Sequence, residues 1–256
     1  MESTNMLAQH TTDLLHRLKL PAMAEALDEQ RRQPDVVSLD FEDRLALLLE
    51  REHVARENRR LTRLLQIARL RHSAAIEDVN FRVQRGLDKS QLLRLATGHW
   101  IQQHGVLLIT GPTGTGKSWL ACALGHSACR HGYLVRYLRL PRLLPELAIA
   151  RSDGTYGKVL AQLGKADLLI LDDWGLAPIG DRERRDLLEM IEDRTGRRAT
   201  LLTSQVPVEH WHGGVGDATF GDAIMDRLVH HAHRITLTGG SPRKLGATPA
   251  ADPVTP

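Results

Sequence analysis

An eight-residue segment rich in glycine constrains this chain more than any other feature. Residues Gly111 to Ser118 read GPTGTGKS and match the pattern G-x-x-x-x-G-K-[S/T] at every fixed position. The aliphatic run Val106 to Ile109 is typical of a buried strand, and the residues from Trp119 onward are typical of a helix. A strand, a glycine-rich turn and a helix in this order point backbone N–H groups at a polyphosphate. The segment therefore predicts a site for a nucleoside triphosphate.

Each part of this loop has an expected role. The glycines allow the backbone to approach the phosphates closely. Lys117 is expected to contact the β- and γ-phosphates, and the hydroxyl of Ser118 is expected to bind Mg²⁺. The predicted nucleotide-binding residues are Gly111, Pro112, Thr113, Gly114, Thr115, Gly116, Lys117 and Ser118.

Paired carboxylates follow another aliphatic run, Leu168 to Leu171. Open parallel sheets bind ligands at the C-terminal ends of their strands, which is where Asp172 and Asp173 are expected. We expect Asp172 to hold Mg²⁺ through the water ligands of the metal, and Asp173 to orient or polarise the attacking water. Many hydrolysing enzymes with this loop have Glu at the second position. Because Asp is one methylene shorter, the pair predicts slow hydrolysis or a site that a partner completes.

Polar residues also end the apolar strand that precedes Pro207. Ser204 or Gln205 could sense the γ-phosphate there, and the sequence leaves both open. Arg227 lies on an expected helix just before the last strand, where an arginine can stabilise the charge that develops in phosphoryl transfer. The sequence does not decide whether Arg227 would act on its own nucleotide or on that of a neighbouring subunit, and a surface ion pair is the alternative.

The sequence from residue 105 onward alternates short aliphatic runs with helical stretches. This alternation predicts an α/β fold, with a parallel sheet covered by helices on both faces. The expected strands are residues 105–110, 134–138, 167–171, 199–203 and 234–237. The expected helices are residues 117–131, 140–151, 156–163, 182–194 and 222–232.

The chain is expected to have three parts. Residues 1–72 contain no glycine and are predicted to form a small all-α domain, which includes a long charged helix with Ser38 as its expected N-cap. Residues 73–240 are expected to form the nucleotide-binding domain. Residues 241–256 are rich in proline and are expected to be a disordered tail.

The long charged helix carries basic residues on one face. Arg56, Arg59, Arg60 and Arg63 follow the spacing i, i+3, i+4, i+7, which places them on a common side of the helix. Such a face can contact the phosphates of DNA without reading its sequence, and this contact weakens with salt. The alternative is a solvated helix face whose arginines pair with acids.

Composition excludes several classes of protein. The chain has 256 residues, a formal net charge of +3 and two cysteines, Cys122 and Cys129. The cysteines lie seven residues apart on one expected helix, too far to form a disulfide, and a disulfide-built secreted scaffold is excluded. No apolar run is long enough to span a membrane, and cytoplasmic location is expected. Aromatic residues make up 4%, which argues against a base-stacking surface.

These motifs together resemble the AAA+ ATPases and, more narrowly, the IstB-like transposition helper proteins of bacterial insertion sequences. The resemblance spans about residues 7 to 244. The segments that carry it are residues 44–52, 57–60, 111–118, 168–175, 203–212 and 226–230.

The resemblance implies a P-loop fold of the AAA+ type and an ATPase that uses ATP and Mg²⁺. It also implies assembly as a homo-oligomer on duplex DNA, recruitment and stimulation of a cognate transposase, and resetting by hydrolysis. The helical domain of residues 1–72 would bind DNA and support oligomerisation. The paired Asp172 and Asp173 fit the pattern of the family.

Two other functions remain open at this stage. A DnaC-like loader of a replicative helicase shares the ATPase core, and its client would be a helicase ring instead of a transposase. A small-molecule kinase uses the same loop but needs an arginine-rich lid, and the sequence contains no such segment.

Overall fold

The computed structural model describes residues 2–239, and the side chains of residues 6–36 and 38–239. The tail expected at 241–256 lies outside the described residues. The chain forms two compact units with a boundary between Arg63 and Leu64. This boundary falls inside a long helix, α4 (Phe41–Ala68), which contributes residues to both units.

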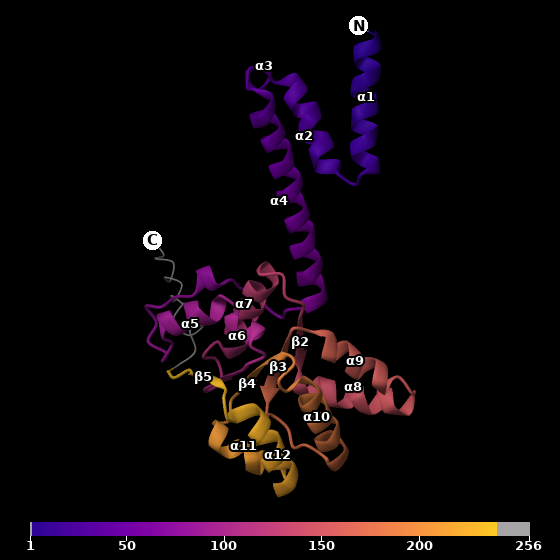
Figure 1. Ribbon diagram of the computed structural model, residues 1–256. Coiled ribbons are helices and arrows are strands. Elements are labelled where there is room, and N and C mark those ends of the chain that lie inside the picture. The colour runs from indigo at the N-terminus through magenta and orange to yellow at the C-terminus, as the bar shows by residue number, and fades with distance from the viewer. Residues whose placement is uncertain (1, 240–256) are drawn as a thin grey trace, which may run out of the picture. The chain divides into compact units, whose positions relative to one another are not determined.

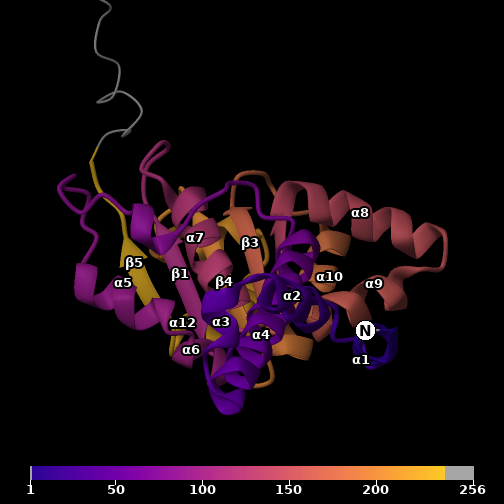
Figure 2. The same cartoon turned by 90° about the horizontal axis from the view of Figure 1, so that it is seen from above.

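The larger unit is built on a five-stranded sheet with the strand order β2-β3-β4-β1-β5 (Figures 1 and 2). All four strand pairings are parallel, as expected. The strands are β1 (Val106–Thr110), β2 (Val135–Arg139), β3 (Leu168–Trp174), β4 (Ala199–Ser204) and β5 (His233–Thr236). The predicted α/β fold is therefore confirmed.

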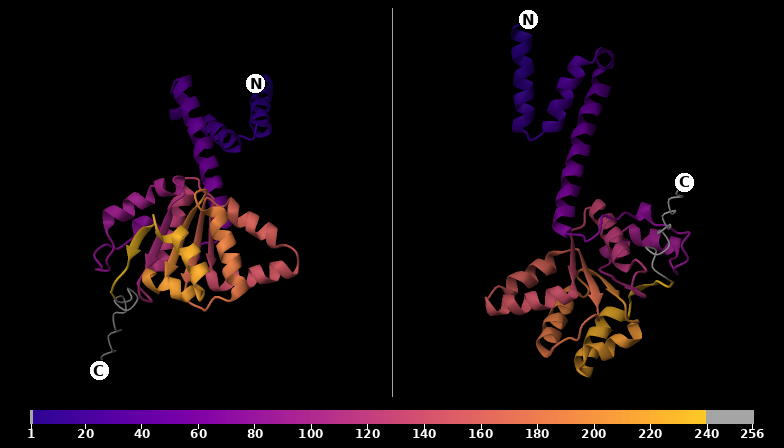
Figure 3. Two further views of the ribbon diagram at one scale, coloured as in Figure 1. Left: turned by 60° about the horizontal axis from the view of Figure 1, so that its bottom comes forward. Right: turned by 180° about the vertical axis from the view of Figure 1, so that it is seen from behind.

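Helices cover both faces of this sheet (Figure 3). One face, which includes Leu108, Leu169 and Leu202, packs against α8 to α12 in a large apolar core. The other face packs against α7, where Gly125 leaves room for Ile170. The covering helices are α5 (Lys89–Ala96), α6 (His99–Gln102), α7 (Lys117–Arg130), α8 (Leu140–Ser152), α9 (Tyr156–Lys165), α10 (Asp181–Arg194), α11 (Trp211–Val215) and α12 (Ala218–Val229).

Strand β3 and helix α12 differ most from their predicted bounds. Strand β3 continues to Trp174, beyond the expected end at residue 171, through an irregularity between Leu171 and Trp174. Helix α12 begins at Ala218 because the side chain of Asp217 caps it by accepting the N–H of Phe220 at 3.0 Å. A 3₁₀ turn covers Ile76–Asp78 between α4 and α5, and another covers Val208–His210 after β4.

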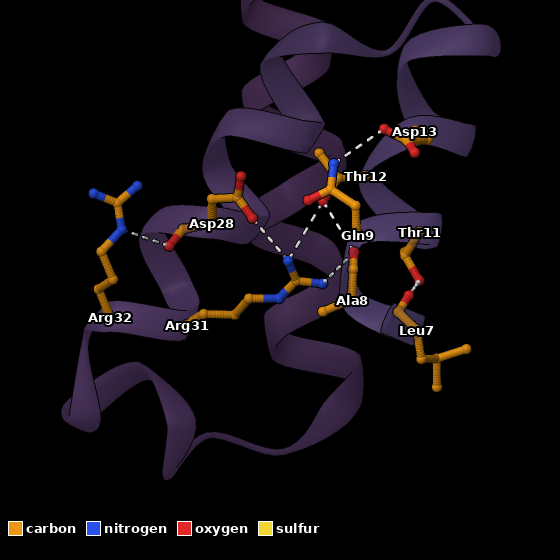
Figure 4. A network of polar contacts seen from close by, with 9 residues as sticks. All are labelled: Leu7, Ala8, Gln9, Thr11, Thr12, Asp13, Asp28, Arg31 and Arg32. Carbon is orange, nitrogen blue, oxygen red and sulfur yellow. Dashed lines mark hydrogen bonds and ion pairs between the residues drawn. The ribbon is translucent and has the colours of Figure 1, made fainter. Parts of the chain in front are cut away.

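The smaller unit is all-helical, as expected for the N-terminal segment. It consists of α1 (Glu2–Arg17), α2 (Pro21–Arg32), α3 (Pro34–Val37) and the first part of α4. Arg31 of α2 ties α1 to α2 by donating to the Thr12 hydroxyl at 3.4 Å and to the carbonyl oxygen of Ala8 at 3.3 Å (Figure 4). Asp28 holds the guanidinium in place at 2.7 Å.

The N-cap predicted for the long helix is wrong. Ser38 is the C-cap of α3, and its hydroxyl donates to the carbonyl oxygen of Asp35 at 2.6 Å. Asp40 caps α4 instead, because its carboxylate accepts the N–H of Asp43 at 2.9 Å. Aspartate, directly before the helix, is an equally good capping residue and lies at the right distance from the first free N–H groups.

Candidate nucleotide-binding site

The glycine-rich loop joins β1 to α7 with the geometry of an anion cradle. Helix α7 begins at Lys117, and its N-cap Gly116 has a φ of 95° and no capping side chain. The N–H groups of the first turn therefore have no capping side chain and are available to an anion. Gly111 has a φ of 145°, and a Cβ on it would lie 2.2 Å from the carbonyl oxygen of Leu237. Only glycine fits at this position.

Lys117 is folded back onto its own loop. Its side chain is buried, and Nζ donates to the carbonyl oxygens of Gly111 at 2.7 Å and Pro112 at 2.8 Å. Burial lowers the pKa of Lys117, against the opposite effect of the Asp172 and Asp173 carboxylates. An ammonium held this close to the loop is placed to meet the phosphates that the loop would bind.

Asp172 lies at the centre of a hydroxyl network and is fully buried. Its Oδ1 accepts from the Ser118 hydroxyl at 2.9 Å and from the Thr203 hydroxyl. Its Oδ2 accepts from the Tyr137 hydroxyl of β2. Burial, followed by the hydrogen bond to Asp172, raises the pKa of Tyr137, so this hydroxyl stays protonated and donates.

The residue types present fit Mg·ATP. Carboxylate and hydroxyl oxygens, such as those of Asp172 and Ser118, are the donors that Mg²⁺ prefers. These two side chains are already in contact, and the loop adds the glycine cradle and the buried Lys117. A pocket of about 640 Å³ opens beside them, lined by loop residues and by Asp173 and Gln205. This volume is within the range that small-molecule sites occupy.

Asp173 adopts a left-handed backbone conformation, with a φ of 66°. Its Oδ2 accepts from Arg139 Nε at 2.8 Å and pairs with a terminal guanidinium nitrogen of Arg139 at 2.7 Å. This hydrogen bond is the main reason that the pKa of Arg139 is raised. No sequence motif singled out Arg139, which lies on the neighbouring strand β2.

The two candidates for a γ-phosphate sensor occupy different environments. Ser204 is buried, and its hydroxyl donates to the carbonyl oxygen of Trp174 at 2.8 Å and accepts the N–H of Val206 at 3.0 Å. Gln205 lines the pocket, and its Oε1 accepts from the Thr113 hydroxyl of the loop at 2.6 Å. The geometry thus places Gln205 beside the loop and Ser204 in the interior.

Arg227 is not brought to this pocket. Its guanidinium pairs with Glu192 of α10 at 2.7 Å and donates to the carbonyl oxygen of Ala223 at 2.7 Å. The side chain is about one-third exposed. The structure therefore places Arg227 at a surface ion pair, away from the residues that line the nucleotide pocket of its own chain.

One wall of the pocket comes from a segment that sequence reasoning missed. This segment runs from the end of α4 toward α5. Its pocket-lining residues are Arg71, His72, Asp78, Asn80, Val83 and Arg85. No motif marks them, and the only signal was their position in an irregular stretch before the first strand.

The predicted DNA-binding arginines lie in the smaller unit and take part in local ion pairs. Arg56 and Arg59 contact Glu52 Oε1 at 2.9 and 3.0 Å, yet about half of each side chain is exposed. Arg60 lies 3.8 Å from Glu57, and Arg63 is exposed. The basic face is therefore accessible, and part of it also has a structural role.

That structural role centres on Glu52, which is buried. Its Oε2 accepts the backbone N–H groups of Ala22 at 2.9 Å and Met23 at 3.1 Å, and so caps the N-terminus of α2. Burial alone would raise the pKa of Glu52. The hydrogen bonds from Arg56 and from the two backbone N–H groups outweigh burial and lower that pKa.

Comparison with known proteins gives a consistent result over nearly the whole chain. A family model described as IstB-like ATP binding protein matches residues 13–249. The insertion sequence ATP-binding protein y4pL of Sinorhizobium fredii is 51% identical over 239 residues, which cover 93% of this chain and 98% of that protein. An IS1162 ATP-binding protein of Pseudomonas fluorescens is 54% identical over 203 residues, or 79% of this chain and 88% of that protein.

Solved structures share the fold at much lower identity. DnaI matches with a TM-score of 0.57 and 20% identity, over 68% of this chain and 93% of that one. DnaA of Aquifex aeolicus, bound to AMPPCP, matches with a TM-score of 0.55 and 20% identity, over 65% of this chain and 51% of that one. At this identity the likeness extends to the fold alone. Within residues 2–239, no helix is long and apolar enough to cross a bilayer.

Proposed function

Because this chain belongs to the family of IstB-like ATP-binding proteins of insertion sequences, a family of P-loop ATPases, we propose that it is the ATP-dependent DNA-binding helper of a transposition reaction. In this proposal it assembles on duplex DNA with ATP, recruits and stimulates its transposase, and is reset by hydrolysis. The observation that carries the proposal is the extent of the match, which includes most of the helical N-terminal unit as well as the nucleotide pocket.

The loop residues Gly111 to Ser118 would hold the phosphates in this proposal. Lys117 would exchange its bonds to the loop carbonyls for phosphate oxygens. Ser118 and Asp172 would hold Mg²⁺, which would neutralise charge on the β- and γ-phosphates. Gln205, already hydrogen-bonded to the loop, is the better placed of the two candidates to respond to the γ-phosphate.

Asp173 would position the attacking water. Both of its contacts with Arg139 fall on Oδ2, so Oδ1 is the oxygen that is available to a water. These contacts tie one oxygen of the carboxylate to Arg139, and the aspartate side chain is one methylene shorter than the glutamate of many hydrolysing enzymes with this loop. This pairing supports slow hydrolysis that DNA or a partner protein accelerates. Arg227, which lies away from its own pocket, would then act on the nucleotide of a neighbouring subunit.

The helical segment of residues 1–72 would bind DNA and support oligomerisation, and residues 73–240 would form the ATPase domain. The exposed halves of Arg56 and Arg59, together with Arg60 and Arg63, would contact phosphates. Exposed arginines give affinity that does not depend on base sequence and that falls with salt.

The proposal is tested by DNA binding and by partner choice. Fluorescence anisotropy of a labelled duplex should rise with Mg·ATP or a non-hydrolysable analogue, and K117A should remove the nucleotide dependence. Pull-downs should retain the cognate transposase and not a hexameric replicative helicase. Retention of the helicase alone would favour the loader, which the fold likeness to DnaI leaves as the second candidate.

A further inference from the structure

Arg85 is a buried cation without a compensating acid. Its side chain lies in the wall of the nucleotide pocket and is 8% exposed. Its Nε has no hydrogen-bond partner, and a terminal nitrogen makes one long hydrogen bond, 3.4 Å, to the carbonyl oxygen of Thr115. Asp78 lines the same pocket, but within residues 2–239 it forms no ion pair with Arg85.

Such an arrangement is unfavourable in the structure as it stands. A buried charge is stabilised only by a partner charge and by hydrogen bonds to its polar atoms. Burial lowers the pKa of Arg85, and no group raises it in return. Arginine nevertheless remains charged in proteins, so this guanidinium needs an anion.

The backbone holds Arg85 firmly beside the loop. The N–H of Thr238 donates to the carbonyl oxygen of Arg85 at 2.9 Å, and that of Leu237 donates to the carbonyl oxygen of Thr110 at 2.7 Å. The chain that continues from β5 thus fixes both Arg85 and the start of the phosphate loop. Two hydrogen bonds from one segment hold the backbone of Arg85 beside the start of the phosphate loop.

The loop also leaves space for this side chain. A Cβ on Gly116 would lie 3.0 Å from a terminal nitrogen of Arg85. The guanidinium therefore sits against the last glycine before Lys117, at the N-terminus of α7, where the helix favours anions.

We propose that Arg85 is a nucleotide-binding residue that pairs with the phosphate chain of the bound nucleotide. The proposal rests on ATP binding at the loop and adds the Arg85 guanidinium to Lys117 as a cation for the phosphates in the same pocket. Guanidinium groups suit phosphate because several N–H donors lie in one plane. The bound phosphates would supply the anion that Arg85 lacks.

The test compares R85M with the wild-type chain and with R82M. Arg82 is an exposed arginine three residues away and outside the pocket lining, so R82M is a matched control. Binding of a fluorescent ATP analogue with Mg²⁺ is measured, followed by competition with ATP and with inorganic tripolyphosphate, which has no base. Thermal unfolding of the nucleotide-free proteins is measured separately.

If Arg85 pairs with phosphate, R85M should weaken the binding of ATP and of tripolyphosphate by the same factor, about 10- to 100-fold. The melting temperature without nucleotide should stay the same or rise, because methionine removes an uncompensated charge and fills similar space. R82M should match wild type in both measurements.

Two results would overturn the assignment: unchanged affinity in R85M, whether or not the melting temperature without nucleotide falls, or a loss of affinity for ATP alone. The last would place Arg85 against the base. If R85M does not fold, R85K serves instead. The lysine ammonium of R85K has fewer donors than a guanidinium and should weaken the binding of tripolyphosphate by about 3- to 10-fold. Unchanged binding would refute the proposal. A wild-type chain that fails to bind Mg·ATP would refute the ATP site itself.

Discussion

Replacing Glu52 with glutamine tests the buried cap that joins α2 to α4. The carboxylate accepts two backbone N–H groups, at 2.9 and 3.1 Å, and two arginine N–H groups, at 2.9 and 3.0 Å. Glutamine keeps a similar shape and an acceptor oxygen, so E52Q removes the charge and leaves the packing largely intact. The amide nitrogen would face either the helix N-terminus or the arginines, and both positions require an acceptor.

The magnitude follows from these four contacts. Hydrogen bonds to a charged group contribute about 1.5–3 kcal/mol each, roughly twice the value for neutral groups. We expect E52Q to lose about half of the free energy of the two buried hydrogen bonds to the backbone N–H groups of α2, which is about 2 kcal/mol. The arginines are half exposed, so water screens their pairs with Glu52, and they add at most about 1 kcal/mol together. We expect E52Q to lower the local stability of α2 by about 2–3 kcal/mol.

Hydrogen–deuterium exchange of the peptide that covers α2 measures this change. A loss of 2–3 kcal/mol corresponds to exchange that is about 30- to 150-fold faster near neutral pH. E50Q, which changes an exposed glutamate on the same helix, is the control and should leave exchange unaltered. Equal exchange in E52Q and wild type would refute the capping role.

The pH dependence has a definite sign. The pKa of Glu52 is lower in the folded chain than its ordinary value of 4.5. Its stabilising effect is therefore fully present above about pH 4.5 and is lost as the pH falls through the lower, folded-state pKa. The difference in the local stability of α2 between wild type and E52Q should be largest at pH 7 and should become smaller in acid. A difference that grows on acidification would contradict the assignment.

Three further predictions concern the nucleotide site and the basic helix. K117M should weaken Mg·ATP binding by at least about 100-fold in calorimetry, because it removes the buried ammonium beside the loop; normal heats of binding would exclude the site. Y137F should lower Tm by about 4–8 °C through the lost hydrogen bond to Asp172, and an unchanged Tm would show that this bond adds nothing. R63E should weaken DNA binding and reduce the slope of log affinity against log salt by about 1; an unaltered slope would exclude a phosphate contact at Arg63.

The exposed arginines complicate the DNA experiment in an informative way. Charge reversal at Arg59 would break its pair with Glu52 and so disturb α2 as well as any phosphate contact. Arg63 has no such contact among the residues the structure describes. Loss of DNA binding in R63E, with the exchange of α2 unchanged, separates recognition from stability.

Several features of the site could be predicted because they are local in sequence. The strand, the glycine-rich loop and the first turn of α7 are contiguous, and each glycine is required by backbone geometry at its own position. Asp172 and Asp173 directly follow an apolar strand, and parallel strands present their C-terminal ends at one edge. Their proximity to Ser118 follows from topology alone.

Other features could not be predicted. Arg139 lies at the end of β2, and only the order of strands places it beside Asp173. Arg85 belongs to an irregular segment with no periodicity, and its place in the pocket depends on hydrogen bonds to the chain after β5. Glu52 accepts the N–H of Ala22, 30 residues earlier in the chain, a contact that no local pattern encodes.

The alternation of strands and helices, the phosphate loop and the positions of the paired carboxylates are all encoded locally, because backbone geometry and burial impose these patterns on neighbouring residues. Which charges meet was settled by the packing of the elements. It buried Arg85 without an acid, paired Arg139 with Asp173 and joined Glu52 to α2. Electrostatic partners act through space over a few ångströms, and residues distant along the chain reach that distance only when the elements pack.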